Sequence, residues 1–112
     1  MRRVNEAVRE VLSVAITTYV KDPRIGFVTV TSVDTSPDLR HAHVYVSVLG
    51  DDAERDDSLV GLESARGYLQ SQVARELRLK HTPQLAFRYD ESVARGQRIQ
   101  QLLREEPEEP PS

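Results

Sequence analysis

Residues 58–79, SLVGLESARGYLQSQVARELRL, contain the pattern that decides the fold. Apolar residues recur at helical spacing on both sides of a central glycine: Leu59 and Leu62 in residues 58–64, and Leu69, Val73 and Leu77 in residues 68–79. The glycine ends the tripeptide Ala65-Arg66-Gly67, and a glycine costs about 1 kcal/mol inside a helix. The stretch therefore predicts two consecutive helices that meet at an angle, with a kink at Ala65 and Gly67.

Residues 41–48 form the clearest strand of the chain. Apolar residues alternate there with polar and aromatic ones, so one face should be buried and the other solvated. The expected buried residues are Ala42, Val44, Val46 and Val48. His41 and His43 lie on the other face, where two imidazoles could be half of a metal site. No third ligand has an obvious spacing, so an ordinary solvated face is favoured.

A second strand is predicted over residues 25–33, which are rich in β-branched residues. The alternation leaves two possibilities open: either Val28 and Val30 or Phe27 and Val33 face the core. Residues 34–38, DTSPD, have turn chemistry and separate this strand from the next. The two strands are therefore predicted to form a hairpin.

The chain before this hairpin predicts a helix over residues 3–19, which Asp22-Pro23 ends. Its apolar stripe comprises Val4, Val8, Leu12, Ala15, Ile16 and Tyr19. After the hairpin, residues 50–57 are mostly acidic and are expected to form a loop. Asp56, Asp57 or Ser58 could then cap the helix that begins at residue 58.

The third strand is short and is predicted at residues 85–89, where Leu85, Phe87 and Tyr89 alternate with other residues. Asp90-Glu91-Ser92 then opens a helix that continues to residue 103. The fold class is thus α+β, with a three-stranded mixed sheet and the helices on one face. The preference for right-handed crossovers favours placing the third strand beside the first and parallel to it.

Composition limits the kind of protein. A chain of 112 residues is long enough for one modest core, and it has no cysteine for a disulfide, a thiolate metal site or a nucleophile. The expected organisation is one domain over residues 1–104 and a disordered acidic, proline-rich tail over residues 105–112. The charged N-terminal residues do not resemble a signal peptide, and no segment could span a bilayer. A cytoplasmic protein without a membrane partner is expected.

Charge is distributed unevenly along the chain. The net charge is −3, but residues 105–112 contain four Glu and residues 51–57 contain five acids and one Arg. Residues 65–104 contain eight Lys or Arg and only three acids. Salt screens charges over roughly 10 Å, so a local basic surface can bind phosphate despite the negative total.

Four motifs stand in the order seen in a known family. They are KDPRIG at residues 21–26 leading into VTVT at 28–31, SPDL at 36–39 followed by strand residues 42–47, ARG at 65–67, and PQLAFRYDES at 83–92. With the order of elements, they resemble a type II KH domain and, more specifically, the ribosome-binding factor A family. The resemblance covers most of residues 2–104.

The resemblance implies a fold in which Ala65-Arg66-Gly67 replaces the Gly-x-x-Gly loop of KH domains. It also implies a ribosome assembly factor that binds immature small (30S) subunits transiently, near the 5′-terminal helix of their 16S rRNA. Such a factor promotes late rRNA processing, subunit maturation and cold adaptation. It would be a monomer and no enzyme, with no cofactor and no small-molecule substrate. Gln70 departs from the basic residue expected in many relatives.

The predicted RNA-binding residues gather around the second helix of the pair. Tyr68, Arg75 and Arg78 fall on the side opposite the apolar stripe, and Lys80 extends that side. Arginine grips phosphate through paired donors and a tyrosine ring stacks on bases. The simpler interpretation is that these charges only solvate the helix.

Further predicted contacts lie at the kink and in the turn before the first strand. Arg66 is the contact favoured most, because helix breaks often expose backbone donors to phosphate. Gly67 is also a predicted contact, unless the kink alone requires it. Lys21 and Arg24 flank a turn and could reach rRNA, although Arg24 could equally pair with Asp22.

Two other classes of function have weaker support in the sequence. A protein-interaction module would use the exposed face of the sheet, with His43 and Tyr45. An enzyme would need converging catalytic groups, and the sequence has no phosphate-binding glycine loop or serine-nucleophile motif. A helix start explains Asp90-Glu91-Ser92 without a catalytic acid.

Overall fold

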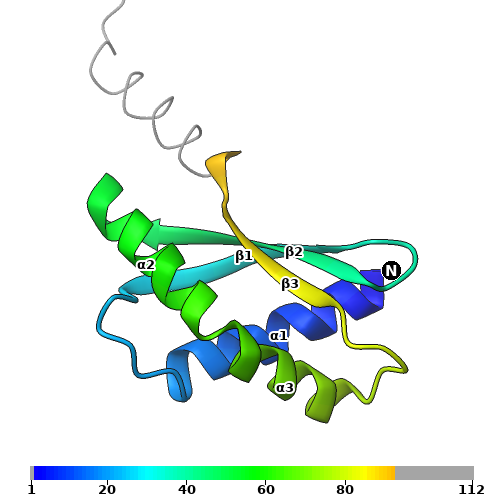
Figure 1. Cartoon of the computed structure of the whole chain (residues 1–112). Helices are drawn as coiled ribbons and strands as arrows, with labels where there is room; N and C mark the ends of the chain where they lie inside the picture. The colour runs from blue at the N-terminus through cyan, green and yellow to red at the C-terminus, as the bar shows by residue number, and fades with distance from the viewer. Residues whose placement is uncertain (1, 93–112) are drawn as a thin grey trace, which may run out of the picture.

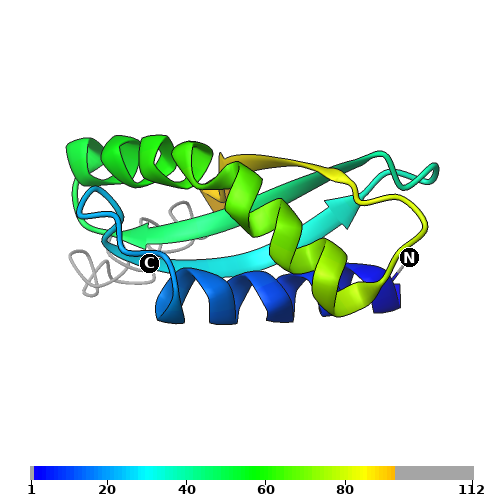
Figure 2. The ribbon, with the colours of Figure 1, turned by 60° about the horizontal axis from the view of Figure 1, so that its bottom comes forward.

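The structure, a computed structural model, describes residues 2–92. Its elements are α1 (Arg2–Thr18), β1 (Phe27–Thr35), β2 (His41–Leu49), α2 (Asp52–Ser64), α3 (Arg66–Leu77) and β3 (Gln84–Tyr89) (Figure 1). The strands form one sheet in the order β1-β2-β3. The helices lie on one face of this sheet, with α3 crossing obliquely in front of it in Figure 2. The predicted α+β class with a three-stranded mixed sheet is confirmed.

The position of the third strand differs from the prediction. β3 pairs with β2 in parallel, with Ala42 opposite Leu85, and it does not lie beside β1. The α2–α3 pair is thus the helical crossover that joins two neighbouring parallel strands. On the helical side, α1 packs on β1, and α2 packs on β2 and β3. The expected pairing with the first strand was wrong.

β1 and β2 form the predicted antiparallel hairpin, but β1 does not keep one alternation throughout. The register shifts between Val30 and Ser32, so one residue of β1 is extra at this point. Because the shift reverses the alternation, Val30 and Val33 are both buried, whereas Phe27 is 79% exposed. Val30 comes from the first predicted pair, Val28 and Val30, and Val33 comes from the second, Phe27 and Val33. Neither pair alone predicted the core residues of β1.

The core lies between the helices and the inner face of the sheet. Its buried residues are Val8, Leu12, Ala15, Ile16, Val30, Val33, Ala42, Val44, Val46, Val48, Leu62, Leu69, Val73 and Leu85. The predicted inward face of β2 is confirmed in full. Tyr19 was wrongly assigned to the stripe of α1, because the helix ends at Thr18 and Tyr19 is 57% exposed.

The acidic segment before α2 is helical rather than a loop. Asp51 is the N-cap, and its carboxylate accepts a hydrogen bond from the Glu54 backbone N–H at 2.8 Å. The Glu54 side chain in turn accepts from the Asp51 backbone N–H at 3.2 Å. This reciprocal capping box and the acids of the first turn stabilise the positive end of the helix. None of the predicted caps serves this role, and Ser58 is instead buried.

The predicted break between the two helices is present at Ala65, where the backbone has φ −90° and ψ 3°. Gly67, two residues further along the chain, lies within α3 and does not have a positive φ. A Cβ added to Gly67 would meet nothing within 4 Å. The kink therefore does not need a glycine at position 67, contrary to that part of the prediction.

Gly67→Ala should consequently stabilise the fold. Alanine loses less conformational freedom than glycine on entering a helix, so the free energy of unfolding should rise by about 0.5–1 kcal/mol. Urea unfolding followed by circular dichroism measures this change. A lower unfolding midpoint in the variant would mean that the space around position 67 is occupied.

The described chain ends just after β3. The Asp90 carboxylate accepts hydrogen bonds from the Ser92 backbone N–H at 3.0 Å and from Thr31 Oγ1 at 2.6 Å. Residues 91 and 92 are helical, as the predicted helix start requires. The rest of that predicted helix and the acidic tail lie outside the described residues. No helix within residues 2–92 is both long enough and apolar enough to cross a membrane.

Candidate functional site

One side of α3 is buried and the other faces solvent. Leu69 and Val73 are fully buried against the core. At about 100° per residue, Tyr68, Ser71 and Arg75 fall on the opposite side, and all three are exposed. We call this side, together with Gly67, Arg78 and Lys80, the α3 cationic surface. The predicted division of the helix into a core side and a cationic side agrees with the burial pattern.

The end of α3 adds two further cations to this surface. Arg78 is the C-cap in the left-handed region, with φ 50°, and its backbone N–H donates to the Ala74 carbonyl at 3.1 Å. Lys80 follows in the exposed loop. Within residues 2–92, none of Arg75, Arg78 and Lys80 forms an ion pair. Their charges are therefore available to an external anion.

Arg66 occupies a different place from the other arginines. In the helical rotation of α3 it falls on the side of Leu69 and Val73, at the break rather than on the α3 cationic surface. Its guanidinium lies 3.6 Å from the Glu63 carboxylate, and both side chains are partly exposed. Leu59 and Val60 of α2 line the shallow hollow beside it. A ligand on Arg75 and Arg78 would reach Arg66 only by extending around the helix.

Gln70 has a structural contact that the sequence did not indicate. Its side-chain oxygen accepts a hydrogen bond from the Leu85 backbone N–H at 3.1 Å. The bond ties α3 to the start of β3 and so fixes the position of the α3 cationic surface relative to the sheet. A lysine or arginine has no acceptor and could not make this bond.

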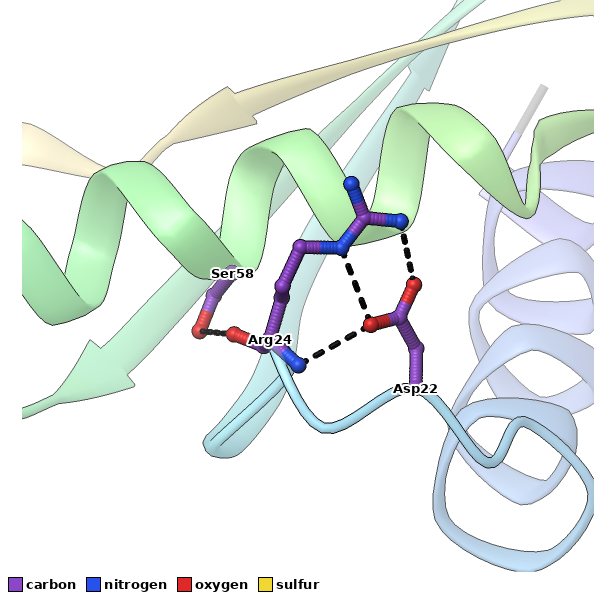
Figure 3. Close-up of polar contacts among 3 residues, drawn as sticks. All are labelled: Asp22, Arg24 and Ser58. Carbon is purple, nitrogen blue, oxygen red and sulfur yellow. Dashed lines mark hydrogen bonds and ion pairs between the residues drawn. The ribbon is translucent and has the colours of Figure 1, made fainter.

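Arg24 pairs with Asp22, which is one of the two roles predicted for it from the sequence (Figure 3). Its guanidinium donates to both carboxylate oxygens of Asp22, at 3.0 and 2.6 Å, and its backbone N–H donates to the same carboxylate at 2.9 Å. The Ser58 hydroxyl of α2 donates to the Arg24 carbonyl and accepts from the Gly26 N–H at 3.1 Å. The turn is thus fastened to α2, and Lys21 remains exposed beside it.

The pair with Arg24 lowers the pKa of Asp22 from 3.8 to about 2. Because the pKa is lower in the folded chain, the pair stabilises the fold above pH 3.8 and loses this effect as the pH falls towards 2. Arg24→Gln should return the pKa of Asp22 towards 3.8. A carbon NMR titration of the Asp22 carboxyl tests this, and a pKa that stays near 2 in the variant would contradict the geometry.

The open face of the sheet offers little chemistry of its own. His41 and His43 are exposed there, and the ring of His43 lies edge-on to that of Tyr45 at 6.4 Å. Among residues 2–92, no three acidic, histidine or cysteine side chains gather closely enough to hold a metal ion. The contact of the Asp90 carboxylate with the Ser92 backbone N–H is that of a helix start, and its bond from Thr31 links the end of β3 to β1.

Arg55 was not singled out from the sequence. It pairs with Asp52 and lies over the ring of Tyr89, 4.7 Å from its centroid, so it links α2 to β3. Only its spacing to Asp52 is visible in the sequence. The contact with Tyr89 depends on the position of β3.

Comparisons with known proteins identify the family of this chain. The family model described as ribosome-binding factor A matches residues 1–103. The chain is 57% identical over 104 residues to a ribosome-binding factor A of Anaeromyxobacter sp. (strain K), a match that covers 92% of this chain and 75% of the relative.

Two structures of the Thermus thermophilus protein are also similar. The crystal structure of its ribosome-binding factor A has a TM-score of 0.70 at 26% identity, covering 79% of this chain and 93% of that one. A homology model fitted into the cryo-EM map of a complex with the 30S subunit has a TM-score of 0.63 at 27% identity, covering 75% and 88%. With the element order and the break at Ala65, these similarities establish that the chain belongs to the ribosome-binding factor A family.

Proposed function

We propose that this chain binds the small ribosomal subunit through its 16S rRNA and acts, without catalysis, in late rRNA processing and subunit maturation. The observation that carries the proposal is the α3 cationic surface, where Arg75, Arg78 and Lys80 are exposed towards the end of α3 and Tyr68 is exposed near its start. Family membership supports it, as does the relative placed in a complex with the 30S subunit. The proposed setting is the cytoplasm, where the chain acts as a monomer without a cofactor or a small-molecule substrate.

The chemistry of the α3 cationic surface suits RNA. Each guanidinium presents a planar fork of donors that matches a phosphate, while the Tyr68 ring, 42% exposed, can stack on an unpaired base. Gly67 lies on this side of the helix and leaves room for a sugar-phosphate backbone to approach. We include Arg66, Lys21 and Arg24 as outer contacts, which join the interface if rRNA extends beyond α3.

The acidic segments lie apart from this surface in the sequence. Asp51, Asp52 and Glu54 are used at the start of α2, and four Glu stand in residues 105–112. We propose that residues 1–104 are the RNA-binding domain and that the acidic tail only opposes phosphate. Deleting residues 105–112 should therefore strengthen rRNA binding slightly, because four negative charges are removed. A filter-binding titration that shows weaker binding would contradict this role of the tail.

Co-sedimentation tests the proposed function directly. The purified chain is centrifuged with free small subunits, with large subunits and with whole ribosomes, at a low and a high salt concentration. We expect preferential binding to free small subunits that weakens steeply with salt. Equal binding to large subunits would contradict the proposal. If the amount bound did not change with salt concentration, the rival function would be favoured, which is a protein-interaction module on the open face of the sheet.

A further inference from the structure

A hollow of about 290 Å³ lies between α1 and α3, which pack against each other (Figure 2). The apolar part of its lining comes from α1 and the residue that follows it, and comprises Val11, Val14, Ala15 and Tyr19. The α3 part of the lining comes from Gln72, next to the buried Val73, and from residue 76 one turn later. We call this feature the α1–α3 hollow.

Two apolar side chains of the α1–α3 hollow are left to solvent. Val14 is 55% exposed and Tyr19 is 57% exposed. Val14 lies one turn from the partly buried Val11, so the two are neighbours on one side of α1. The backbone of Tyr19 continues this helical turn, because its N–H donates to the Ala15 carbonyl at 2.9 Å. Single exposed apolar residues are ordinary, but here two of them line one hollow.

Both charged residues that line the α1–α3 hollow are acidic. Glu10 of α1 and Glu76 of α3 are exposed, and among residues 2–92 neither carboxylate forms an ion pair. The amide of Gln72 adds a group that can both donate and accept hydrogen bonds. The two carboxylates would repel a phosphate and attract a lysine or an arginine. The charges of the hollow therefore favour a cationic partner and disfavour a nucleic acid.

We propose that the α1–α3 hollow is a docking site for a cationic, amphipathic segment of a protein partner. Apolar side chains of the segment would cover Val14 and Tyr19, while its Lys or Arg side chains would pair with Glu10 and Glu76. A helix that inserts one apolar face into a groove is a common mode of peptide recognition. The inference goes beyond rRNA binding and does not depend on it: α3 would contact RNA with the side of Arg75 and protein with the side of Glu76.

An NMR titration locates the docking site on the full-length chain. The isotope-labelled protein is titrated with a helical peptide that has leucine on one face and lysine on the other. We expect amide shifts concentrated at Val14, Gln72 and Glu76. The same peptide with glutamate in place of every lysine should bind about tenfold more weakly or worse. Shifts confined to the other acidic segments, residues 51–57 and 105–112, would show attraction to acids in general and overturn the proposal.

Paired variants separate the two carboxylates of the hollow from net charge. Glu10→Gln combined with Glu76→Gln should weaken binding of the lysine peptide by about twofold to thirtyfold, because two exposed ion pairs are lost. The matched control is Asp34→Asn combined with Asp56→Asn, which removes the same charge from exposed residues that do not line the hollow. The control should leave the affinity nearly unchanged. Equal losses in the two double variants would refute the site.

Further measurements identify the occupant. Tyr19→Ala removes an exposed ring and should weaken peptide binding by about tenfold, whereas an unchanged affinity would refute the apolar contact. Without peptide, a shift of the Val14 amide with protein concentration would assign the hollow to a second copy. A shift of the same amide on addition of a uridine oligonucleotide would assign it to RNA. Either of these two shifts would overturn the proposal.

Discussion

Gly61→Ala should lower the free energy of unfolding by about 1–3 kcal/mol, the usual cost of overpacking a tight contact. A Cβ added to Gly61 would lie 2.6 Å from Ile25 Cγ1 and 3.3 Å from its Cδ1. Cγ1 is bonded to the branched Cβ and moves only when χ1 changes, so either Ile25 must leave its preferred rotamer or α2 must shift. The loss would appear even though alanine is the better helix former by about 1 kcal/mol. Urea unfolding measures it.

Two comparisons separate packing from helix propensity. Gly67→Ala makes the same chemical change in the next helix, where the added methyl group meets nothing, and its effect should have the opposite sign. Adding Ile25→Ala to Gly61→Ala removes the clashing atoms, so the double variant should lose less than the sum of the two single variants. If Gly61→Ala were as stable as the unchanged protein, the close approach of the turn to α2 would be refuted.

Arg75→Glu combined with Arg78→Glu should weaken binding to small subunits by about a hundredfold or more. A charge-assisted hydrogen bond contributes about 1.5–3 kcal/mol, and each tenfold change in affinity is about 1.4 kcal/mol. Glutamate also repels the phosphate that arginine would bind. Both positions are outside the core, so the fold should be retained, although glutamates at the C-terminal end of α3 should lower its stability slightly. Fluorescence anisotropy of the labelled chain with purified subunits measures the affinity.

The matched control is Arg9→Glu combined with Arg40→Glu, which changes the net charge by the same amount. These residues lie on α1 and in the hairpin turn, and neither belongs to the α3 cationic surface. Arg9 loses only an exposed pair with Glu6, which contributes little to stability. The control should weaken binding far less. Equal losses in the two double variants would mean that total charge, and not α3, determines binding.

Much of the fold could be predicted because its signals are local. The alternation of β2 identifies Val44 and Val46 as core residues without knowledge of any other element. The four-residue spacing of Leu69 and Val73 likewise divides α3 into two sides. A local signal can also give a wrong prediction. The high acid content before α2 suggested a loop, whereas the three-residue spacing of Asp51 and Glu54 matches a capping box at the start of a helix.

The remaining features depend on contacts between distant residues. The choice of β2 rather than β1 as the neighbour of β3 depends on how the helices share one face of the sheet. The need for glycine at position 61 arises from Ile25, which is 36 positions away in the chain. The sequence predicted the side of α3 that carries Arg75, but it could not predict the bond from Leu85 to Gln70 that fixes this helix.

The central claim is that arginines of α3 contact phosphates of rRNA in the small subunit. The salt dependence of the association constant, measured in parallel for the unchanged chain and for the Arg75→Glu, Arg78→Glu variant, tests it most directly. Each lost phosphate contact should flatten the slope of log K against log salt by about 0.7–0.9, so the variant should be flatter by about 1.4–1.8. Identical slopes for the two proteins would contradict the claim, whatever the difference in affinity.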